Sequence, residues 1–231
     1  MNRSATLIAC SHGTRAPAAQ ALVTSLVEAV GARRPGTAMR ELFVDVQEPA
    51  LATALPEVPG DVVVVPLFLS GGYHLNHDIR QAAASHPRAT VTAPLGPDPL
   101  LTDLQVRRLV EVGWQPGDVV VLAASASSDH RAVRDVDRAA ALLRERLGTE
   151  VTVGVVGGAG VQVAEAVAAA RRPGRRVVVS SYLLMPGYFH AQVLAAGADV
   201  TSHPLLTGAP PSELIELVER RFDEVSMSRA A

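Results

Sequence analysis

The chain of 231 residues holds 48% hydrophobic and 19% charged residues, enough for one large folded domain or two small ones and too apolar for disorder. Its net charge of −2 provides no general basic surface, so we expect neither nucleic acid nor membrane as a partner. All 21 basic residues are arginines, and the absence of lysine excludes Schiff-base chemistry and nucleotide sites built on a P-loop lysine.

Cysteine usage and the first residues predict the compartment. Cys10 is the single cysteine, so no internal disulfide can form, which is typical of a reducing cytosol. The first residues lead into a strand-like segment without a signal peptide, and no apolar run approaches the roughly 20 residues of a membrane span. We therefore expect a soluble, cytoplasmic protein.

Strand-like and helix-like segments alternate through the first half of the chain. Residues 61–69 are apolar almost throughout, as expected for a parallel strand covered by helices on both faces. Asp98 before Pro99 is a favourable helix N-cap followed by proline at the first helical position. The alternation predicts a doubly wound α/β layer. The strand-like segments are 5–10, 41–46, 61–69 and 89–94, and the helical ones are 17–34, 76–86 and 98–112.

The same rhythm starts again after a turn-rich segment at 113–118. The segment "VVVPLFLSGGYH" at 63–74 matches "VVSSYLLMPGYF" at 178–189, and "SHGTR" at 11–15 falls near "ASASS" at 124–128. Both offsets are about half the chain, which indicates an internal duplication. We expect two similar lobes, each a small parallel sheet flanked by helices. The predicted lobes are 1–113, which carries the active site, and 118–231, a degenerate repeat.

Residues that follow the strands are the candidates for chemistry, because parallel α/β sheets bind ligands beyond the carboxyl ends of their strands. His12 follows the first strand, Asp45 lies in the second, and "SGGYH" at 70–74 follows the third, with His77 just behind. Two histidines and a carboxylate suit a divalent first-row metal or proton transfer near neutral pH. The residues alone leave open a shared site or separate, hydrogen-bonded loop positions.

Other signals are weaker. "GVVGGAG" at 154–160 does not fit a dinucleotide fingerprint, since Val163 takes the place of the third glycine, and no nucleotide cofactor is expected. His86, His130 and His203 are expected in loops or on the surface.

As a set, "SHGTR", "FVDVQEPAL", "VVVPLFLSGGYHLNHDI" and "PLGPDPLLTDL" closely resemble the sirohydrochlorin chelatases, the class II, ATP-independent chelatases. The resemblance covers essentially the whole chain, because long members of that family have two lobes. It implies a lyase that inserts Fe²⁺ or Co²⁺ into sirohydrochlorin for sirohaem or cobalamin. The metal, Fe²⁺, Co²⁺ or Ni²⁺, is then a substrate, and no organic cofactor is needed.

The resemblance assigns roles to individual residues. His12 and His74 match the family's metal-binding and proton-abstracting pair. Asp45 stands where the family usually has a glutamate, one methylene longer, and is the third expected metal ligand. Glu48 of the "EP" pair is the reserve carboxylate, and the choice between the two stays open. In the second lobe the first histidine is replaced near Ser125.

Contacts with the tetrapyrrole are expected around these residues. Its acetate and propionate groups call for arginine or backbone N–H donors, tyrosine can pack against the ring, and Gly13 should leave room for a flat ligand. The expected substrate-binding residues are Arg15, Ser70, Gly71, Gly72, Tyr73, His77 and His190.

Two alternatives stay open. A non-catalytic carrier of metal or tetrapyrrole could use the same histidines. "HGTR" is faintly similar to histidine phosphatases, but Ser11 precedes His12 where those enzymes have a phosphate-binding arginine. Two internal lobes could replace the dimer of a single-lobed enzyme, so a monomer is compatible with the sequence.

Overall fold

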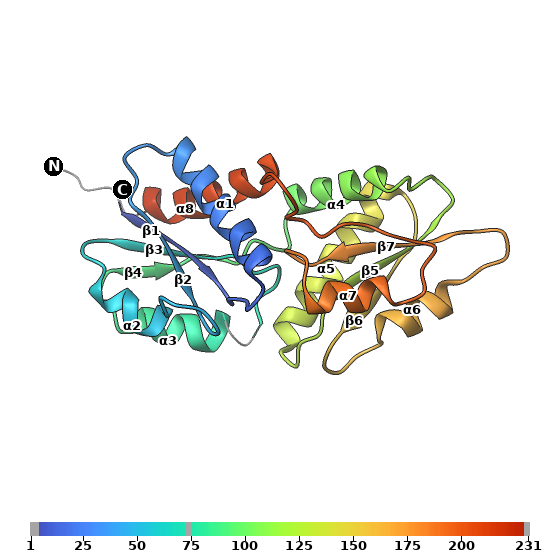
Figure 1. Cartoon of the computed structure of the whole chain (residues 1–231), viewed down its shortest axis with the longest axis horizontal. Coiled ribbons are helices and arrows are strands. Elements are labelled where there is room, and N and C mark those ends of the chain that lie inside the picture. The colour runs from blue at the N-terminus through green and yellow to red at the C-terminus, as the bar shows by residue number, and fades with distance from the viewer. Residues whose placement is uncertain (1–4, 73–74, 229–231) are drawn as a thin grey trace. The chain divides into compact units, whose positions relative to one another are not determined.

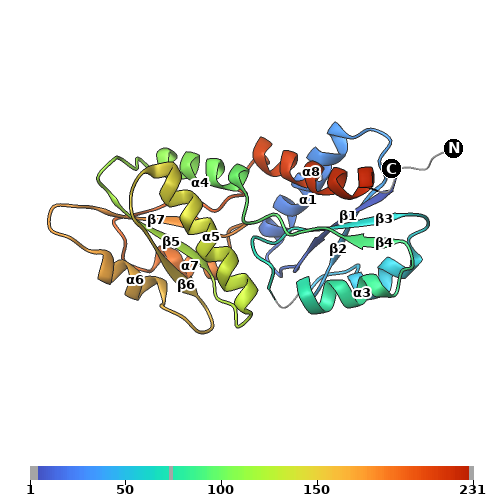
Figure 2. The same ribbon diagram turned by 180° about the vertical axis from the view of Figure 1, so that it is seen from behind.

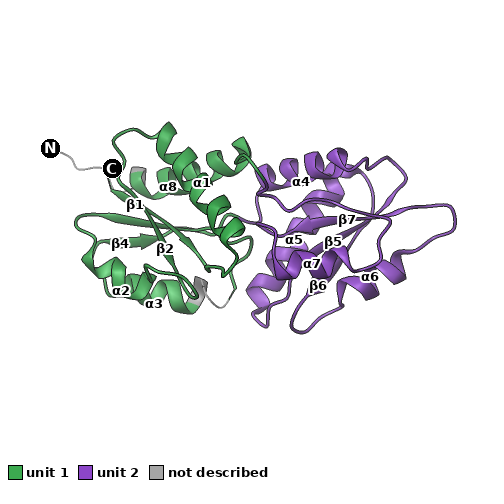
Figure 3. Ribbon diagram, in the orientation of Figure 1, with its two compact units in different colours: residues 1–95, 208–231 green, residues 96–207 purple. Residues whose placement is uncertain are grey.

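The computed structural model describes residues 5–72 and 75–228, which form two compact units (Figure 1, Figure 3). Unit 1 comprises residues 1–95 and 208–231, and unit 2 comprises residues 96–207. Each unit contains one four-stranded parallel sheet with helices on both faces. The predicted two-lobed α/β fold is confirmed. No helix among the described residues is long and apolar enough to cross a membrane.

The sheet of unit 1 has the strand order β2-β1-β3-β4. Helices α1 and α8 lie on one face, and α2 and α3 on the other (Figure 1). The strands are β1 (Thr6–Ser11), β2 (Met39–Phe43), β3 (Val62–Pro66) and β4 (Ala89–Val91). The helices are α1 (Pro17–Arg33), α2 (Leu51–Ala54), the 3₁₀ turn η1 (Leu55–Glu57), the π-helical turn η2 (Leu75–Ile79), α3 (Arg80–Ala84) and α8 (Ser212–Ser228).

Burial explains why the sequence of unit 1 folds in this way. Every residue of β1 and β3 is buried, as the apolar runs predict for strands between two helical layers. The buried residues of α1 recur at helical spacing, and Pro17 stands at its first position, where its missing N–H costs nothing. The buried residues of α1 are Ala19, Val23, Leu26 and Val30.

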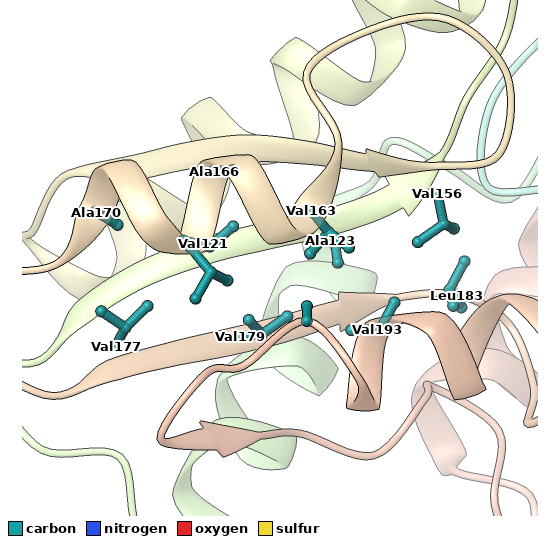
Figure 4. Packing of buried hydrophobic residues seen from close by; sticks show 12 residues of the cluster. Val121, Ala123, Val156, Val163, Ala166, Ala170, Val177, Val179, Leu183 and Val193 are labelled. Carbon is teal, nitrogen blue, oxygen red and sulfur yellow. The ribbon is translucent and has the colours of Figure 1, made fainter.

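The sheet of unit 2 repeats this arrangement with the order β6-β5-β7-β8. Helices α4 and α5 lie on one face (Figure 2), and α6 and α7 pack on the other over an apolar cluster (Figure 4). The strands are β5 (Val119–Ser125), β6 (Val151–Val156), β7 (Val177–Tyr182) and β8 (Val200–Thr201). The helices are α4 (Pro99–Glu111), α5 (His130–Leu147), α6 (Val163–Ala170) and α7 (Tyr188–Leu194).

The units do not follow the expected boundaries 1–113 and 118–231. The last helix of each predicted lobe packs in the other unit. Helix α4 follows β4 in the chain but packs on α5 and β7 of unit 2, where Gln105 donates to Ser180 Oγ (3.1 Å). Helix α8 follows β8 but packs on α1 and β3 of unit 1, where Arg34 holds Asp223 with two hydrogen bonds.

Equivalent arginines fix the exchanged helices. In unit 2, Arg108 of α4 donates to the Leu205 carbonyl beyond β8 (3.1 Å) and to Glu111 one turn on (2.8 Å). In unit 1, Arg221 of α8 donates to the Pro94 and Leu95 carbonyls beyond β4 (2.9 and 3.3 Å). Both side chains are buried, and each gives a charged donor to the backbone beyond the last strand of its unit.

Candidate functional site

The candidate site of unit 1 lies where β1 and β2 end. Beyond the strands, the Val44 N–H donates to the Ser11 carbonyl and the Asp45 N–H to the His12 carbonyl, both at 2.9 Å. These bonds continue the parallel pairing into the loops and hold the backbones of His12 and Asp45 together. Asp45 therefore lies in the loop after β2, not within the strand as the apolar pattern suggested.

Gly13 is required for this approach. Its φ of +93° is in the left-handed region, and a Cβ there would overlap the Asp45 carbonyl oxygen and touch the Val46 side chain. The space beside Gly13 is thus filled by the neighbouring loop. The expectation that Gly13 leaves room for a flat ligand is wrong. Its role is to let the His12 and Asp45 loops meet.

The two candidate carboxylates have different surroundings. Both are exposed. Asp45 Oδ1 accepts the N–H of the next residue, Val46 (2.8 Å), and so stays beside the His12 backbone. Glu48 Oε2 accepts the Ala50 N–H (2.6 Å) at the start of α2. Glu48 is therefore bonded to the residue that precedes α2, whereas Asp45 belongs to the paired loops.

The third strand brings its exit to the same edge. Leu67, just beyond β3, donates its N–H to the Cys10 carbonyl (2.7 Å), so the segment starts next to β1. Ser70 and Gly72 are half-buried and Gly71 is buried. Tyr73 and His74 lie outside the described residues, so their predicted roles stay predictions.

Two further predicted residues of unit 1 are on its surface. His77 is exposed within η2, and its Nδ1 lies 3.0 Å from Asp78 Oδ1. Arg15 is exposed just before α1, in the loop that carries His12. Cys10 is not a candidate ligand, because burial raises the pKa of its thiol to about 12 and keeps it protonated.

His190 has a different environment from the one expected. It lies on α7 of unit 2 with only 9% of its surface exposed, and its Nε2 has no hydrogen-bond partner among the described residues. Burial lowers its pKa, against a hydrogen bond with the Ser202 backbone, and nearby His203 lowers it further. His190 is thus a neutral, largely enclosed imidazole, and its contact with substrate stays a prediction.

The remaining sequence signals find structural explanations. His86 is buried, accepting the Arg88 N–H at Nδ1 and donating from Nε2 to the Val58 carbonyl (2.9 Å). In the glycine-rich segment before α6, Glu165 accepts the Gln162 N–H, so a carboxylate occupies the helix start that a phosphate would need.

One residue at the exit of β2 had no role assigned from the sequence. Gln47 reaches from the β2 loop to the β1 loop, where its Oε1 accepts the Thr14 N–H (2.7 Å). Gln20 of α1 donates to the carbonyl of the same threonine (2.7 Å). Among residues whose side chains are described, no three His, Cys, Asp or Glu side chains gather as a metal site, and His74 lies outside that set.

Comparison with known proteins finds relatives for the N-terminal half of the chain. The model of the CbiX family matches residues 6–112. A sirohydrochlorin cobaltochelatase of Methanococcoides burtonii is 25% identical over 130 residues, covering 48% of this chain and 99% of that relative.

Solved structures extend the likeness to both units. SirB from Bacillus subtilis with Fe³⁺ has a TM-score of 0.81 at 22% identity, covering 98% of this chain and 97% of that one. The B. subtilis subspecies spizizenii SirB complex with cobalt has a TM-score of 0.78 at 23% identity and the same coverage. These structures show that the two-unit fold is shared. By sequence over its N-terminal half, and by fold over both units, the chain thus resembles the CbiX family and the sirohydrochlorin chelatases.

Proposed function

We propose that this protein is a sirohydrochlorin chelatase, a lyase that inserts Fe²⁺ or Co²⁺ into the tetrapyrrole. The observation that carries the proposal is the joining of the β1 and β2 exits, which holds His12 and Asp45 on adjacent backbones. These are the positions at which the family pattern has its histidine and its carboxylate. The same reaction is named for the relatives that match this half of the chain.

The chemistry requires a base and a metal carrier. Two pyrrole N–H protons must leave the macrocycle while the metal loses its water ligands and binds the ring nitrogens. Histidine can accept a proton near neutral pH and is a good ligand for Fe²⁺ and Co²⁺. In this proposal His12 and His74 share these tasks, and a carboxylate holds the metal or steadies the protonated imidazole.

The structure favours Asp45 over Glu48 for that carboxylate. The Asp45 backbone is bonded to that of His12, whereas the Glu48 carboxylate accepts the N–H that starts α2. Aspartate is shorter than the usual glutamate, and the close pairing of the two loops compensates for the missing methylene.

Substrate contacts belong to the same proposal. Arg15 is exposed beside His12 and suits a carboxylate of the macrocycle, because guanidinium binds carboxylate with two parallel hydrogen bonds. The segment 70–72, Tyr73 and His77 are assigned to the same ligand from the third strand's exit. We further propose that the enzyme is cytoplasmic and acts as a monomer without an organic cofactor.

The deciding experiment follows sirohydrochlorin absorbance anaerobically with Fe²⁺, Co²⁺ or Ni²⁺. Wild type should exceed the uncatalysed rate, His12→Ala and His74→Ala should fall to it, and Asp45→Ala should lose more activity than Glu48→Ala. His130→Ala is the matched control, since His130 is exposed at the start of α5 in unit 2. Binding of metal or macrocycle without acceleration would mean a carrier instead, and hydrolysis of a phosphomonoester would indicate a phosphatase.

A further inference from the structure

We propose that Gln47 is a positioning residue for His12, and this inference rests on the proposed function of that histidine. Gln47 Oε1 accepts the Thr14 N–H at 2.7 Å, two residues after His12. The assignment of the amide is fixed by the donor, because a backbone N–H needs an oxygen acceptor. Gln47 thereby joins two loops whose residues are 33 positions apart.

The His12 loop is held on both sides of the histidine. Before it, the Val44 N–H donates to Ser11, and the Asp45 N–H donates to the His12 carbonyl itself. After it, Thr14 accepts a hydrogen bond from Gln20 at its carbonyl and donates its N–H to Gln47. Removing Gln47 would loosen the second side, because the Thr14 N–H loses its acceptor and the Gln20 contact alone is left there.

The loop that carries Gln47 has an unfavourable backbone. Val46 has a φ of +52°, rare for a β-branched residue, and the Gln47 N–H donates across it to the Asp45 carbonyl (2.7 Å). Such strain persists only where surrounding contacts hold it in place, and it is concentrated at functional sites. The turn points the Gln47 side chain back toward Thr14, so the strained residue serves this contact.

Unit 2 provides an internal comparison. An isolated bridge closes the loop after each second strand, Phe43 to Ala50 in unit 1 and Val155 to Gln162 in unit 2. Counting from these bridges, Ala159 stands in the place of Gln47. Alanine cannot accept a hydrogen bond at its side chain, so the contact is specific to the unit with the catalytic histidine.

The expected effect is on turnover rather than on binding. A slack His12 loop would misplace the base and ligand in the transition state while leaving the macrocycle's carboxylate contacts intact. We expect Gln47→Ala to lower kcat about 10- to 100-fold, as loss of a ligand's supporting partner does elsewhere. KM for sirohydrochlorin should stay within about twofold.

The test compares Gln47→Ala with Gln47→Glu and Gln162→Ala. Glutamate keeps an oxygen for the Thr14 N–H, so Gln47→Glu should stay within about threefold of wild-type kcat. Gln162 donates to the Gly158 and Gly160 carbonyls of the corresponding loop of unit 2, so Gln162→Ala disturbs that loop without touching the site. Its kcat should equal that of wild type.

A readout without turnover accompanies the kinetics. In the NMR spectrum of the full chain, Gln47→Ala should speed exchange of the Thr14 amide at least about tenfold and change the His12 ring signals, and Gln47→Glu should do neither. Wild-type kcat in Gln47→Ala would overturn the inference, as would equal losses of kcat and melting temperature in the alanine and glutamate variants.

The two proposals fail separately. If wild type does not accelerate metallation, the proposed function is wrong. The NMR comparison still decides whether Gln47 positions His12: unchanged Thr14 exchange and His12 signals would overturn it, and the expected changes would support it.

Discussion

The loops after β2 and β6 are closed by the same type of backbone hydrogen bond but differ in side chains and in part of their backbone, since Gly157 and Gly160 of the second loop also have positive φ. In unit 1 the Phe43 N–H donates to the Pro49 carbonyl (3.1 Å), and in unit 2 the Val155 N–H donates to the Val161 carbonyl (2.8 Å). The central residue of each loop has nearly the same φ, +52° at Val46 and +57° at Gly158. Glycine adopts this conformation without strain and valine does not. At this position unit 1 therefore has a backbone strain that unit 2 avoids.

The two units also differ in which loop carries the glycine at the contact between the loops. In unit 1 the small residue is Gly13, and a Cβ there would meet both Asp45 and Val46. In unit 2 the corresponding residue is Ala126, and the small residue is Gly158, whose added Cβ would lie 3.0 Å from the Ala126 Cβ. At this contact each pair of loops has one glycine, on the first loop in unit 1 and on the second loop in unit 2. Unit 1 places it beside the histidine and leaves the other loop free to carry side chains.

The largest effect is expected for Gly13→Ala. The new Cβ would overlap the Asp45 carbonyl at a positive φ, so the free energy of unfolding should fall by about 3 kcal/mol and chelatase activity should be lost. Gly60→Ala is the matched control, because Gly60 has a φ of +89° but open space around it. That variant should lose about 1 kcal/mol, the conformational cost alone. Equal losses in urea titrations would show that the loops are not in tight contact.

The exchanged helices give the next largest effect. Arg221→Ala and Arg108→Ala should each lower stability by about 2 kcal/mol, since buried carbonyls lose a charged donor. Hydrogen exchange resolved by strand should show the loss in unit 1 for Arg221→Ala and in unit 2 for Arg108→Ala. A loss in the opposite unit would contradict the exchange of α4 and α8.

The sequence predicted the strands better than it predicted the sheet against which each helix packs. Buried parallel strands are continuously apolar, so both sheets could be recognised, but an amphipathic helix shows only which face is buried. The pattern of α4 fits either sheet, and its place in unit 2 depends on Gln105 and Arg108 meeting residues far along the chain. The expected boundary at 113–118 failed for this reason.

The site was predictable to the same extent. The adjacency of His12 and Asp45 could be predicted because strand exits of a parallel sheet converge. The role of Gln47 could not be predicted, since its hydrogen bond to Thr14 depends on a turn with an unusual valine conformation. Gly13 was recognised as special for the wrong reason, because the neighbouring loop was not visible in the sequence.

A smaller effect is expected when the strained pair is moved into unit 2. Gly158→Val should cost about 2 kcal/mol, because valine meets Ala126 and has a positive φ. Adding Ala126→Gly gives unit 2 the glycine and valine that unit 1 has at Gly13 and Val46. The double variant should regain the stability lost to the clash with the Ala126 side chain, but not the stability lost to the positive φ of valine. Melting temperatures of the single and double variants measure this coupling. Full additivity would show that the two positions are independent.

The smallest effect is expected for His190, whose surroundings differ from those of His12. His12 is half-buried at a strand exit, whereas His190 is enclosed and its pKa is lowered by burial. As pH falls, the unfolded chain protonates His190 first, below about 6.5, so stability is lost between that pH and the lower pKa of the folded state. The loss cannot exceed about 1.4 kcal/mol for each unit by which the pKa is lowered. His190→Gln should flatten this part of the stability profile between pH 7 and 5, and the exposed His130→Gln should not. Parallel profiles for wild type and His190→Gln would mean that the enclosed ring is protonated as readily in the folded chain as in the unfolded one.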